Sequence, residues 1–506
     1  MPPLWLGGFV RVIIAARRSA LARLQAHLVA QSLQHVYPQL DITFHFRESL
    51  GDQQLDKPLW QMPEKGVFTE DLRAELAAQS CDLVVHSWKD LPVEENPQTE
   101  IVATLPRADA RDLLLVREDR WPQVVNSGII SLLTSSPRRT QNLKSFLPSA
   151  LPAEIHTVNF VPVRGNIPTR VQKMWQQDAD GLILAKAALD RLLEADTEEF
   201  TETKAELRRA LAQCHWMVLP LATNPTAPAQ GALAIEIARQ RTDLREMLAQ
   251  INCIATFTAV TREREILRRH GGGCHQAIGV SVLERPYGEI TIVRGLDERG
   301  NELAELSLQA ARPRPAKIER ALLWPPQLAD NDWFAREPIP AEQPDATIAL
   351  WIAKADALPS GWQISPRQIV WASGLQTWRR LAERGVWVNG SAESLGEQEA
   401  PRLETLAGCA LEWRKLSHAD TGENGAWPTV ATYQLQPHAE SPALAGYEYF
   451  FWTSGSNFAR ALTANPWLRD KTHFCGPGNT QVALERAGIE PHVFLDYQQW
   501  LAEMSI

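Results

Sequence analysis

The sequence lacks the features of a disulfide framework, a metal centre or a membrane anchor. Its six cysteines include no CxxC pair and no metal-ligand spacing, so we expect reduced thiols and no bound metal. Its apolar runs, such as DLVVHS (82–87), are far shorter than the ~20 residues that cross a membrane. No basic region precedes the apolar N-terminus, and Arg11 interrupts it, which indicates a buried strand rather than a secretory signal. We therefore expect a cytoplasmic protein.

Positive charge and nucleotide-binding motifs are also scarce. The chain has 51 lysines and arginines against 60 aspartates and glutamates, which gives a net charge of −9. Because no broad basic stripe is available to follow phosphates, we expect no nucleic-acid partner, and the short apolar runs predict no membrane partner. Neither GxxxxGK[ST] nor GxGxxG occurs, which disfavours nucleotide ligands. Any concentrated group of cations therefore stands out.

Length and composition predict several domains. At 506 residues the chain is too long for a single hydrophobic core. Residues 311–345 contain seven prolines, which is typical of an extended linker. Six of the 18 tryptophans precede residue 320 and twelve follow it, so we expect the C-terminal part to be built differently.

The pattern of apolar residues predicts α/β architecture. Up to about residue 245, short apolar runs alternate with helical patterns, as in VRVIIAA followed by SALARLQAHLVAQSLQHV. That alternation is typical of βαβ units and mainly parallel sheets. Residues 250–310 instead indicate one helix and then three strands separated by PYG and DERGN turns. This segment predicts a small α+β domain with an antiparallel sheet.

Cationic and small polar residues follow the predicted strands. In α/β sheets, ligands bind beyond the carboxyl ends of the strands, where loops and helix N-termini meet. In SSPRR, Ser136 can also cap a helix whose first residue is Pro137. Each group alone fits a solvated helix face, a surface ion pair or a turn, but four groups at equivalent positions predict a site for a ligand with several negative charges. The four groups are Arg17, Arg18 and Ser19; Lys89 and Asp90; Ser135, Ser136, Arg138 and Arg139; and Arg164, Asn166 and Arg170.

Two further residues are candidates for chemistry. Asp90 is the one acid among these cations, and an ionised carboxylate there suits the stabilisation of a cationic intermediate more than the delivery of a proton. Cys274 lies in GGGCHQAIG (271–279), directly after the charged helical segment TREREILRRH (261–270). Because glycines end helices readily, this stretch by itself fits either a structural loop with a bystander thiol or a functional cysteine.

Several motifs, taken in this order and spacing, resemble the porphobilinogen deaminase family, also called hydroxymethylbilane synthase. The resemblance extends from about Arg11 to Leu323. It rests on AARRSALARLQAH (15–27), GDQQLDKPLW with EKGVF (51–68), DLVVHSWKDLP (82–92), TSSPRRTQNL (134–143), VRGNIPTR (163–170), DGLILAKAALDRL (180–192), APAQGALAIE (227–236) and GGGCHQAIG (271–279).

The resemblance implies a transferase of porphyrin and heme biosynthesis. Such an enzyme joins four porphobilinogen units head to tail, with loss of ammonia at each step, into a linear tetrapyrrole. Each pyrrole ring carries an acetate and a propionate, which accounts for the many cations. The resemblance places a covalent dipyrromethane cofactor on Cys274 as a thioether, makes Asp90 the catalytic carboxylate, and implies two lobes like those of periplasmic binding proteins. The family positions that contact cofactor or substrate correspond to Arg17, Ser19, Gln25, Lys89, Ser136, Arg138, Arg139, Arg164, Arg170 and Gln230. Further candidates for the same binding site are Arg18, Asp52, Lys65, Ser135, Asn166 and Lys186.

The chain departs from the family pattern at several positions. Residues 49–52 read SLGD where the family commonly has Thr-Arg-Gly-Asp, so one cation is missing, and Arg18 offers a replacement for it. Pro63-Glu64 takes the place of a glycine pair, and Ala229 takes the place of a glycine. Lys186 replaces a small or apolar residue and is a candidate for an extra substrate contact.

The C-terminal segment twice repeats a strand, a Ser/Thr-Gly loop and a helix, which predicts a flavodoxin-like α/β domain. The pattern is similar to uroporphyrinogen-III synthase, which implies cyclisation of the linear tetrapyrrole to uroporphyrinogen III. The Arg-Pro signature expected at the start of that family is absent, so a degenerate interaction module is the alternative. The loops also fit ordinary helix caps. The residues that carry the resemblance are Thr453, Ser454, Ser456, Gly476, Pro477, Gly478 and Thr480.

The predicted organisation is a monomer with four domains and one linker. A non-catalytic binder of polycarboxylates or tetrapyrroles, and a scaffold that passes the linear tetrapyrrole to a partner, are the alternatives for the whole chain. The predicted parts are residues 1–106 plus 227–246, the first α/β lobe; 107–226, the second α/β lobe; 247–324, the α+β domain with Cys274; 325–345, a Pro-rich linker; and 346–506, the uroporphyrinogen-III synthase-like domain.

Overall fold

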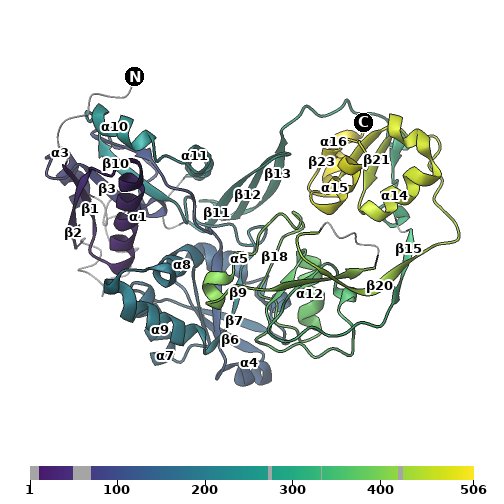
Figure 1. Ribbon diagram of the computed structural model, residues 1–506, viewed down its shortest axis with the longest axis horizontal. Coiled ribbons are helices and arrows are strands. Elements are labelled where there is room, and N and C mark those ends of the chain that lie inside the picture. The colour runs from purple at the N-terminus through teal and green to yellow at the C-terminus, as the bar shows by residue number, and fades with distance from the viewer. Residues whose placement is uncertain (1–10, 49–69, 272–275, 332, 420–424) are drawn as a thin grey trace. The chain divides into compact units, whose positions relative to one another are not determined.

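The chain forms two compact units. The computed structural model describes residues 11–48, 70–271, 276–331, 333–419 and 425–506 (Figure 1). The first unit comprises the described residues up to 145 together with 156–282 and 292–305, and the second comprises 146–155, 283–291 and 306–506. The prediction of a mixed α/β chain with several sheets is confirmed.

The first sheet of unit 1 has the order β2-β1-β3-β10-β4. Strand β1 is parallel to both neighbours, whereas β10 returns antiparallel between β3 and β4. Helices α1, α3 and α10 belong to this lobe. The bounds are β1 (Arg11–Arg17), β2 (Asp41–Arg47), β3 (Leu83–Ser87), β4 (Thr99–Ala103), β10 (Leu233–Ala238), α1 (Ala20–Val36), α3 (Glu70–Ala77), α10 (Thr242–Ala249) and the short helix η2 (Trp88–Asp90).

Helix α1 packs on this sheet through one apolar stripe. Its buried residues Ala26, Val29, Ala30 and Leu33 follow the i, i+3, i+4, i+7 spacing of an amphipathic helix. They share a core with the buried side of the sheet, including Ile14 of β1, so RVIIAA (11–16) lies in a buried strand, as its pattern predicts.

The second sheet of unit 1 has the order β7-β6-β8-β5-β9. Strand β6 is parallel to β7 and β8, and β5 is antiparallel to β8 and β9. In each sheet, four strands therefore run in one direction, and the fifth, β10 or β5, runs antiparallel to its two neighbours directly after the chain has crossed from the other sheet. The bounds are β5 (Asp112–Arg117), β6 (Ile129–Leu133), β7 (Thr157–Val161), β8 (Gly181–Ala185), β9 (Cys214–Val218), α4 (Trp121–Ser127), α5 (Pro137–Leu143), α7 (Ile167–Gln176), α8 (Lys186–Glu194), η3 (Glu198–Phe200) and α9 (Thr201–Leu211).

A three-stranded sheet, β11-β12-β13, follows helix α11. Only two residues connect β11 to β12, a length that permits an antiparallel hairpin and no parallel crossover. The buried face of this sheet packs with Ile266 and Leu267 of α11, as expected for the predicted α+β segment. The bounds are α11 (Ile254–Arg269), β11 (Ile278–Arg285), β12 (Gly288–Leu296) and β13 (Glu302–Ala310).

Unit 2 contains two further sheets, where the sequence predicts a single flavodoxin-like domain. One has the order β15-β20-β19-β16-β17-β18 and the other β14-β21-β22-β23. Strands β14 and β15 precede residue 346, where the predicted domain begins, but they belong to these two sheets. Residues 334–338 pair antiparallel with β20, and residues 323–324 pair with β21. The predicted Pro-rich linker thus contains a strand. Its pattern is hard to recognise because β15 is an exposed edge strand with a single half-buried residue.

The strands of unit 2 are β14 (Leu323–Trp324), β15 (Phe334–Pro338), β16 (Ala349–Ile352), β17 (Val370–Ala372), β18 (Gly390–Ser391), β19 (Trp413–His418), β20 (Thr429–Pro437), β21 (Tyr449–Trp452), β22 (Thr472–Cys475) and β23 (His492–Val493). Its helices are α6 (Leu147–Ala150), η4 (Arg320–Leu322), η5 (Leu328–Asn331), η6 (Ala355–Ala357), α12 (Leu375–Glu383), α13 (Glu404–Ala407), α14 (Gly455–Ala464), η7 (Pro466–Asp470), α15 (Asn479–Arg486) and α16 (Tyr497–Met504).

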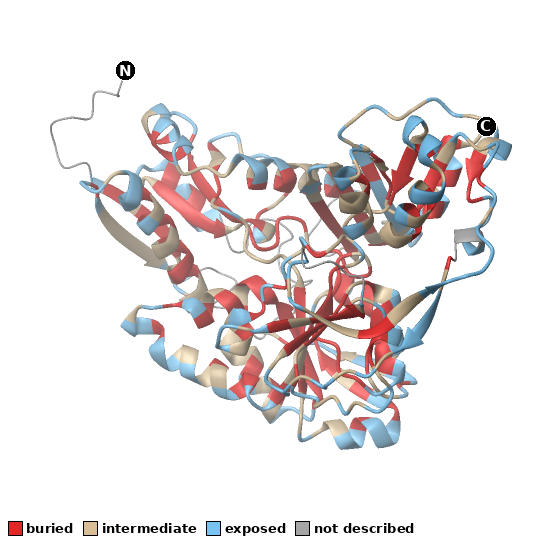
Figure 2. Cartoon of the chain, turned by 45° about the vertical axis from the view of Figure 1, so that its right-hand side comes forward, coloured by how far each residue is buried: buried red, intermediate tan, exposed pale blue. Residues whose placement is uncertain are grey.

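Tryptophans form much of the core of unit 2. The ring of Trp452 lies 4.9 Å from that of Trp324 and 6.4 Å from that of Trp333, and all three side chains are buried. Figure 2 shows buried residues concentrated in the sheets. Aromatic rings bury large apolar areas and gain further from edge and offset contacts, so this cluster is a main source of stability in unit 2.

No helix among the described residues is both long and apolar enough to cross a membrane. The same residues contain no group of three or more His, Cys, Asp or Glu side chains arranged to hold a metal ion.

We predict that Trp452→Ala lowers the free energy of unfolding by about 3–5 kcal/mol, because it removes a fully buried ring from this cluster. Trp467, which is 38% exposed, is the matched control, and Trp467→Ala should cost less than about 1 kcal/mol. Urea denaturation followed by near-ultraviolet circular dichroism measures both. Equal losses in the two variants would contradict the assignment of Trp452 to the core.

Candidate functional site

The first cationic group lies where β1 leads into α1. Ser19 is the N-cap of α1, and its hydroxyl accepts a hydrogen bond from the backbone N–H of Ala22 at 3.4 Å. Arg18 forms an exposed ion pair with Glu48, with 3.0 Å between the nearest atoms. Arg17 is half-buried at the end of β1. Ser19 and Arg17 thus stand at the carboxyl end of a parallel strand, as predicted, whereas Arg18 is engaged at the surface.

Helix α1 also supports the loop that follows β3. Gln25 is buried, and its amide donates a hydrogen bond to the hydroxyl of Ser87 at 2.9 Å. Ser87 is the last residue of β3 and immediately precedes η2, which carries Lys89 and Asp90. Gln25 therefore anchors the start of the segment with the candidate catalytic acid.

Lys89 and Asp90 differ in exposure. Asp90 is exposed, whereas Lys89 is half-buried, and its ammonium group donates a hydrogen bond to Gln230 Oε1 at 3.2 Å. Burial lowers the pKa of Lys89 to about 8, and the cations Arg139 and Arg138 act in the same direction against Asp90 and Asp112. A lysine with this pKa is only partly protonated at slightly alkaline pH.

Ser136 starts helix α5 as predicted. Its hydroxyl accepts a hydrogen bond from the backbone N–H of Arg139 at 3.4 Å, and Pro137 is the first helical residue. The hydroxyl of Ser135 donates to the carbonyl of Val163 at 2.6 Å and accepts from its N–H at 2.8 Å. Ser135 thereby joins the loops after β6 and β7, the neighbouring strands that carry the third and fourth cationic groups.

Arg138 and Arg139 share one buried carboxylate, that of Asp112. Asp112 Oδ2 lies 2.7 Å from the nearest guanidinium nitrogen of Arg138, and Asp112 Oδ1 lies 2.7 Å from that of Arg139. Burial acts to raise the pKa of Asp112, but the two guanidinium groups outweigh this effect and hold the pKa well below its ordinary value. The same carboxylate accepts hydrogen bonds from Asn224 at 2.9 Å and from Gln230 at 2.8 Å.

The fourth group lies at the start of α7. Asn166 is the N-cap, and its side chain accepts a hydrogen bond from the N–H of Thr169 at 3.0 Å. Gly165 has φ +120°, and a Cβ there would lie 2.7 Å from the methyl carbon of Thr169, so this turn requires glycine. Arg170 Nε donates to the carbonyl of Gly165 at 2.7 Å, which fixes its guanidinium near that turn.

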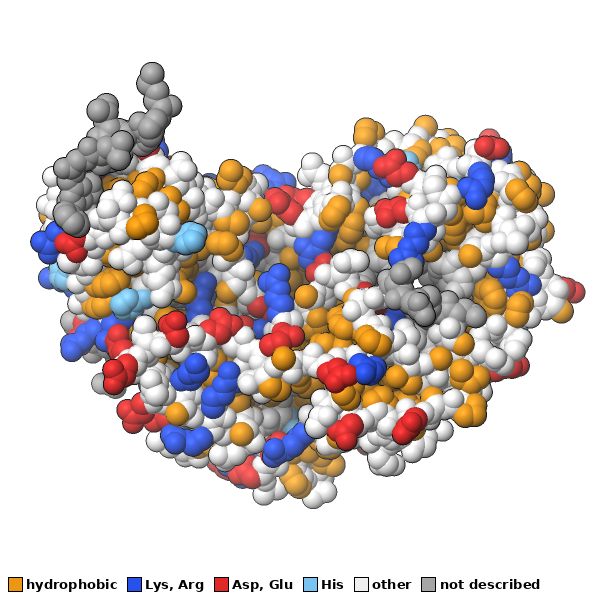
Figure 3. Space-filling view, viewed as in Figure 1, with side chains coloured by type: hydrophobic (Ala, Val, Ile, Leu, Met, Phe, Trp, Pro, Cys, Tyr) orange, Lys and Arg blue, Asp and Glu red, His pale blue; other side chains and the backbone are white. Residues whose placement is uncertain are grey.

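Electrostatic coupling shows that the second, third and fourth groups converge. Burial lowers the pKa of Arg170 to about 10, and the charges of Arg139, Asp90 and Arg164 also act on it. The charges of Asp90 and Arg139 act on Lys89 as well. Asp90 and the cations of η2, α5 and α7 therefore act on one another's surroundings in this part of the first unit. On the face drawn in Figure 3, by contrast, basic and acidic side chains are interspersed.

Lys186 has carboxylate partners of its own. Its side chain is 1% exposed, and its ammonium nitrogen lies 2.5 Å from Asp190 and 3.5 Å from Asp109. Burial raises the pKa of Asp190 to about 6, and Lys186 opposes that rise. The ammonium group thus offers no free charge to a ligand in this arrangement. We assign Lys186 a structural role in place of the predicted substrate contact.

Three predicted site residues, Asp52, Lys65 and Cys274, lie outside the described residues. Before Cys274, helix α11 ends at Arg269 and Gly271 has φ +84°, so the glycine-terminated helix is confirmed. After it, the amide of Gln276 donates to Glu298 at 3.2 Å.

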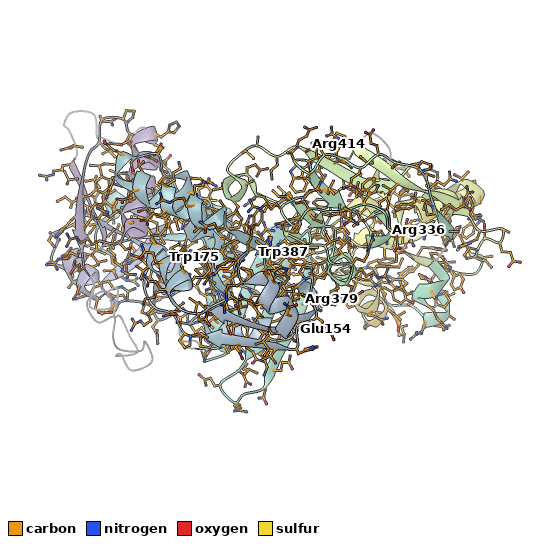
Figure 4. The ribbon with its side chains drawn as sticks, turned by 90° about the horizontal axis from the view of Figure 1, so that it is seen from below. Glu154, Trp175, Arg336, Arg379, Trp387 and Arg414 are labelled. Atoms are coloured by element: carbon orange, nitrogen blue, oxygen red, sulfur yellow. The ribbon has the colours of Figure 1, made fainter. Side chains whose placement is uncertain are left out.

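Asp112, Asn224 and Trp175 are parts of this region that the sequence patterns did not reveal. Asp112 is the first residue of β5 and is followed by four apolar residues, LLLV, so the one signal in the sequence was an acid at the start of an apolar run. Trp175 of α7, labelled in Figure 4, lies 4.7 Å from the guanidinium carbon of Arg117, a cation–π contact that ties α7 to the end of β5.

In unit 2, the Ser/Thr-Gly loops lie at the carboxyl ends of adjacent parallel strands, β21 and β22. Ser454 caps α14 by accepting a hydrogen bond from the N–H of Ser456 at 3.2 Å. Thr453 is exposed, and Gly476 and Thr480 are half-buried.

The loop after β18 approaches these Ser/Thr-Gly loops closely. A Cβ on Gly478, which has φ +87°, would lie 2.6 Å from the Cα of Gly396. The next residue, Glu397, is buried, accepts a hydrogen bond from the amide of Asn479 at 2.6 Å and forms an ion pair with Lys415.

Comparisons with known proteins identify the family of the chain. A family model described as "Porphobilinogen deaminase, dipyromethane cofactor binding domain" matches residues 12–246. The porphobilinogen deaminase of Desulfitobacterium hafniense is 35% identical over 60% of this chain and 90% of its own length. That of Syntrophomonas wolfei is 35% identical over 56% and 83%, and that of Ralstonia nicotianae 32% identical over 61% and 85%.

Among solved structures, YhfZ from Shigella flexneri is 12% identical and covers 51% of this chain and 92% of its own length at a TM-score of 0.24, a likeness that carries no functional argument. The matched segment spans both α/β lobes and is a cofactor-binding domain of transferases. The chain belongs to the porphobilinogen deaminase family, and its cofactor is dipyrromethane.

We predict that Lys186→Met destabilises the chain and leaves the KM for porphobilinogen within twofold. The mutation removes the cationic partner of buried Asp190 but changes no contact with the substrate. Removing one partner of a buried pair costs about 3–5 kcal/mol. Because the pKa of folded Asp190 lies above its unfolded value near ~4, the protonated form stabilises the fold at low pH, and this contribution is lost as pH rises through about 6. The loss of stability should therefore be larger at pH 8 than at pH 5.

Thermal unfolding at the two pH values and steady-state kinetics measure these effects. Lys204, whose ammonium group contacts only a backbone carbonyl among the described residues, provides the control variant Lys204→Met. A tenfold higher KM in Lys186→Met at unchanged stability would restore the role of Lys186 as a substrate contact.

Proposed function

We propose that the chain acts as a hydroxymethylbilane synthase, a transferase that condenses four porphobilinogen units into a linear tetrapyrrole with loss of ammonia. One observation supports this most strongly. The charge of Asp90, an exposed carboxylate, acts on both Lys89 and Arg170, and the charge of Arg139 acts on the same two cations, so groups from η2, α5 and α7 lie near one another. A substrate with an acetate and a propionate on each ring matches this set of charges.

The donor groups of the site fit the dipyrromethane cofactor. The Nε atoms of Arg138 and Arg139 are buried and have no hydrogen-bond partner among the described residues. Carboxylates of a dipyrromethane would supply acceptors for guanidinium groups in this part of the site. When bound, the cofactor provides the pyrrole carbon to which the first new unit is joined. We propose Cys274, in the loop between α11 and β11, as its attachment point.

The residues of the chain have separate roles in the proposed reaction. Lys89, Arg164 and Arg170 bind carboxylates and orient the substrate. Asp90 lies exposed at the end of η2, where its ionised carboxylate stabilises the positive charge that develops on the pyrrole ring as ammonia leaves. Ser19 and Ser136 expose helix N-termini to the same ligand. The topology of the two sheets supports two lobes of the periplasmic-binding-protein type, with residues 1–106 plus 227–246 and 107–226 as their extents.

We also propose that the second unit cyclises the linear product as a uroporphyrinogen-III synthase. The observation that favours this activity is the placement of the loops with Ser454 and Gly476 side by side at the carboxyl ends of β21 and β22. Parallel strands bind ligands at such ends, and loop N–H groups suit propionates. The alternative is an interaction module, since Glu397 places an acid beside these loops.

Intact mass spectrometry tests the attachment point. We expect purified protein to carry an adduct of the mass of two pyrrole units, mapping to the peptide that contains Cys274, and Cys274→Ser to lack both adduct and turnover. Cys409, which is free and exposed, is the control, and Cys409→Ser should keep both. An unmodified Cys274 in folded, active protein contradicts the proposal.

Asp90→Asn tests the catalytic acid. The amide keeps the size of the side chain but removes the charge that stabilises the developing cation, so we expect kcat to fall by at least 10²-fold while the cofactor stays attached. Asp178, also exposed, is the control, and Asp178→Asn should retain wild-type kcat. Wild-type turnover by Asp90→Asn would remove Asp90 from this role.

The identity of the cyclic product tests the second activity. Given porphobilinogen alone, a bifunctional chain should yield uroporphyrinogen III, because uncatalysed closure of the linear tetrapyrrole gives the I isomer. Chromatographic separation of the oxidised porphyrins distinguishes the two. Formation of the I isomer alone, by a chain that still makes the linear product, would indicate an interaction module.

A further inference from the structure

The two chain segments that connect the α/β lobes are hydrogen-bonded to each other. The chain leaves the first lobe between β4 and β5 and returns between β9 and β10. The N–H of Ala108 in the outgoing segment donates to the carbonyl of Gly231 in the returning segment at 3.2 Å. The amide of Gln230 donates to the carbonyl of Ala110 at 2.6 Å, and Arg107 Nε donates to the carbonyl of Gln230 at 2.9 Å.

Asp112 is placed where these segments meet the cation site. It is the first residue of β5, is 0% exposed, and each of its carboxylate oxygens accepts two hydrogen bonds. Oδ1 accepts from Arg139 and Gln230, and Oδ2 accepts from Arg138 and Asn224. The carboxylate therefore has no acceptor capacity left for another group.

These four donors come from different parts of the fold. Arg138 and Arg139 lie in the first turn of α5, whereas Asn224 and Gln230 lie in the returning segment. Gln230 also accepts the hydrogen bond of Lys89 from η2. One carboxylate thus links α5 of the second lobe to η2 of the first.

We propose that Asp112 is a positioning residue for the deaminase reaction: it holds the two arginines of α5 and, through Gln230, Lys89 in the arrangement that receives the carboxylates of cofactor and substrate. This inference rests on the proposed function. Asp112 touches no ligand itself, since all of its acceptor sites are filled by the chain. Its negative charge holds the guanidinium groups of Arg138 and Arg139 in place, because their mutual repulsion would otherwise move them apart.

The remaining contacts of the two arginines support a fixed geometry. Arg138 donates to the side chain of Asn224 at 3.0 Å and to the carbonyl of Pro225 at 2.9 Å, and Arg139 donates to the carbonyl of Ile183 at 3.0 Å. Both side chains are buried, so each guanidinium has one orientation defined by Asp112 and the backbone. Gly279 adds a steric limit, because a Cβ there would lie 2.2 Å from the carbonyl oxygen of Pro225 and 2.9 Å from Cδ of Arg138.

Mutation of a purely structural ion pair would have different effects. Asp180 and Arg120 form such a pair on the same lobe. Asp180 is buried, lies 3.2 Å from Arg120 and accepts a hydrogen bond from the N–H of Ser131 at 2.8 Å. The largest influences on the pKa of Lys89 are burial and the charges of Asp90, Arg139, Asp112 and Arg138, and Asp180 is not among them. The pKa of Lys89 is therefore expected to respond to a change at Asp112 more than to one at Asp180.

The pH profile of kcat/KM for porphobilinogen therefore separates the two roles. Lys89, with a pKa of about 8, loses its charge as pH rises, so the wild-type profile should fall above that pH. Asp112 raises the pKa of Lys89, and Asp112→Asn should accordingly move the alkaline limb to lower pH and raise KM at least tenfold. Asp180→Asn should leave the limb in place and KM within twofold.

Asp112→Glu separates charge from position. It keeps the negative charge, so the alkaline limb should stay near the wild-type pH, but the longer side chain displaces the guanidinium groups and KM should rise at least tenfold. This variant decides the question if Asp112→Asn does not fold, as judged by circular dichroism. A wild-type KM in Asp112→Glu, or an unmoved limb and wild-type KM in folded Asp112→Asn, would overturn the proposal.

Cofactor loading distinguishes failure of this inference from failure of the proposed function. Intact mass should show full dipyrromethane loading in the wild type and Asp180→Asn, and reduced loading in folded Asp112→Asn. An unloaded wild type would refute the proposed function itself, whereas a fully loaded Asp112→Asn with wild-type kinetics would refute only the role of Asp112.

Discussion

The buried contact between one carboxylate and two guanidinium groups is the constraint on which the rest of the site depends. Two arginines cannot share a buried position unless an anion lies between them, because desolvation and mutual repulsion both act against their charges. Asp112 is that anion, and burial of all three side chains makes the arrangement rigid. The Nε atoms of both arginines are buried and have no hydrogen-bond partner among the described residues.

Features set by local sequence were predictable. The start of α5 at Ser136-Pro137 and the end of α11 before its glycines depend on caps and backbone freedom within a few residues. Asp112 was not predictable in the same way, because its partners lie 26 to 118 positions away in sequence. Lys186 shows the converse. Its position in a site motif indicated a ligand contact, but its ammonium group forms ion pairs with Asp109 and Asp190.

The C-terminal unit illustrates a different limit. Its strand–loop–helix repeats are visible in the sequence, but each of its two sheets has an additional edge strand, β14 or β15, and these strands of two and five residues are too short to be recognised from an apolar pattern. The tryptophan enrichment has a direct physical explanation, since Trp324, Trp333 and Trp452 pack together in the core. The proximity of Gly396 to Gly478 brings loops from both sheets together, as a ligand site between them would require.

A crystal structure of the chain loaded with its cofactor tests the central claim most directly. The account predicts carboxylates of the dipyrromethane within hydrogen-bond distance of Arg138, Arg139 and Lys89, with Asp112 still bonded to both arginines and Asp90 facing the pyrrole nitrogens. Cofactor carboxylates directed to solvent, with the arginines contacting Asp112 alone, would contradict it.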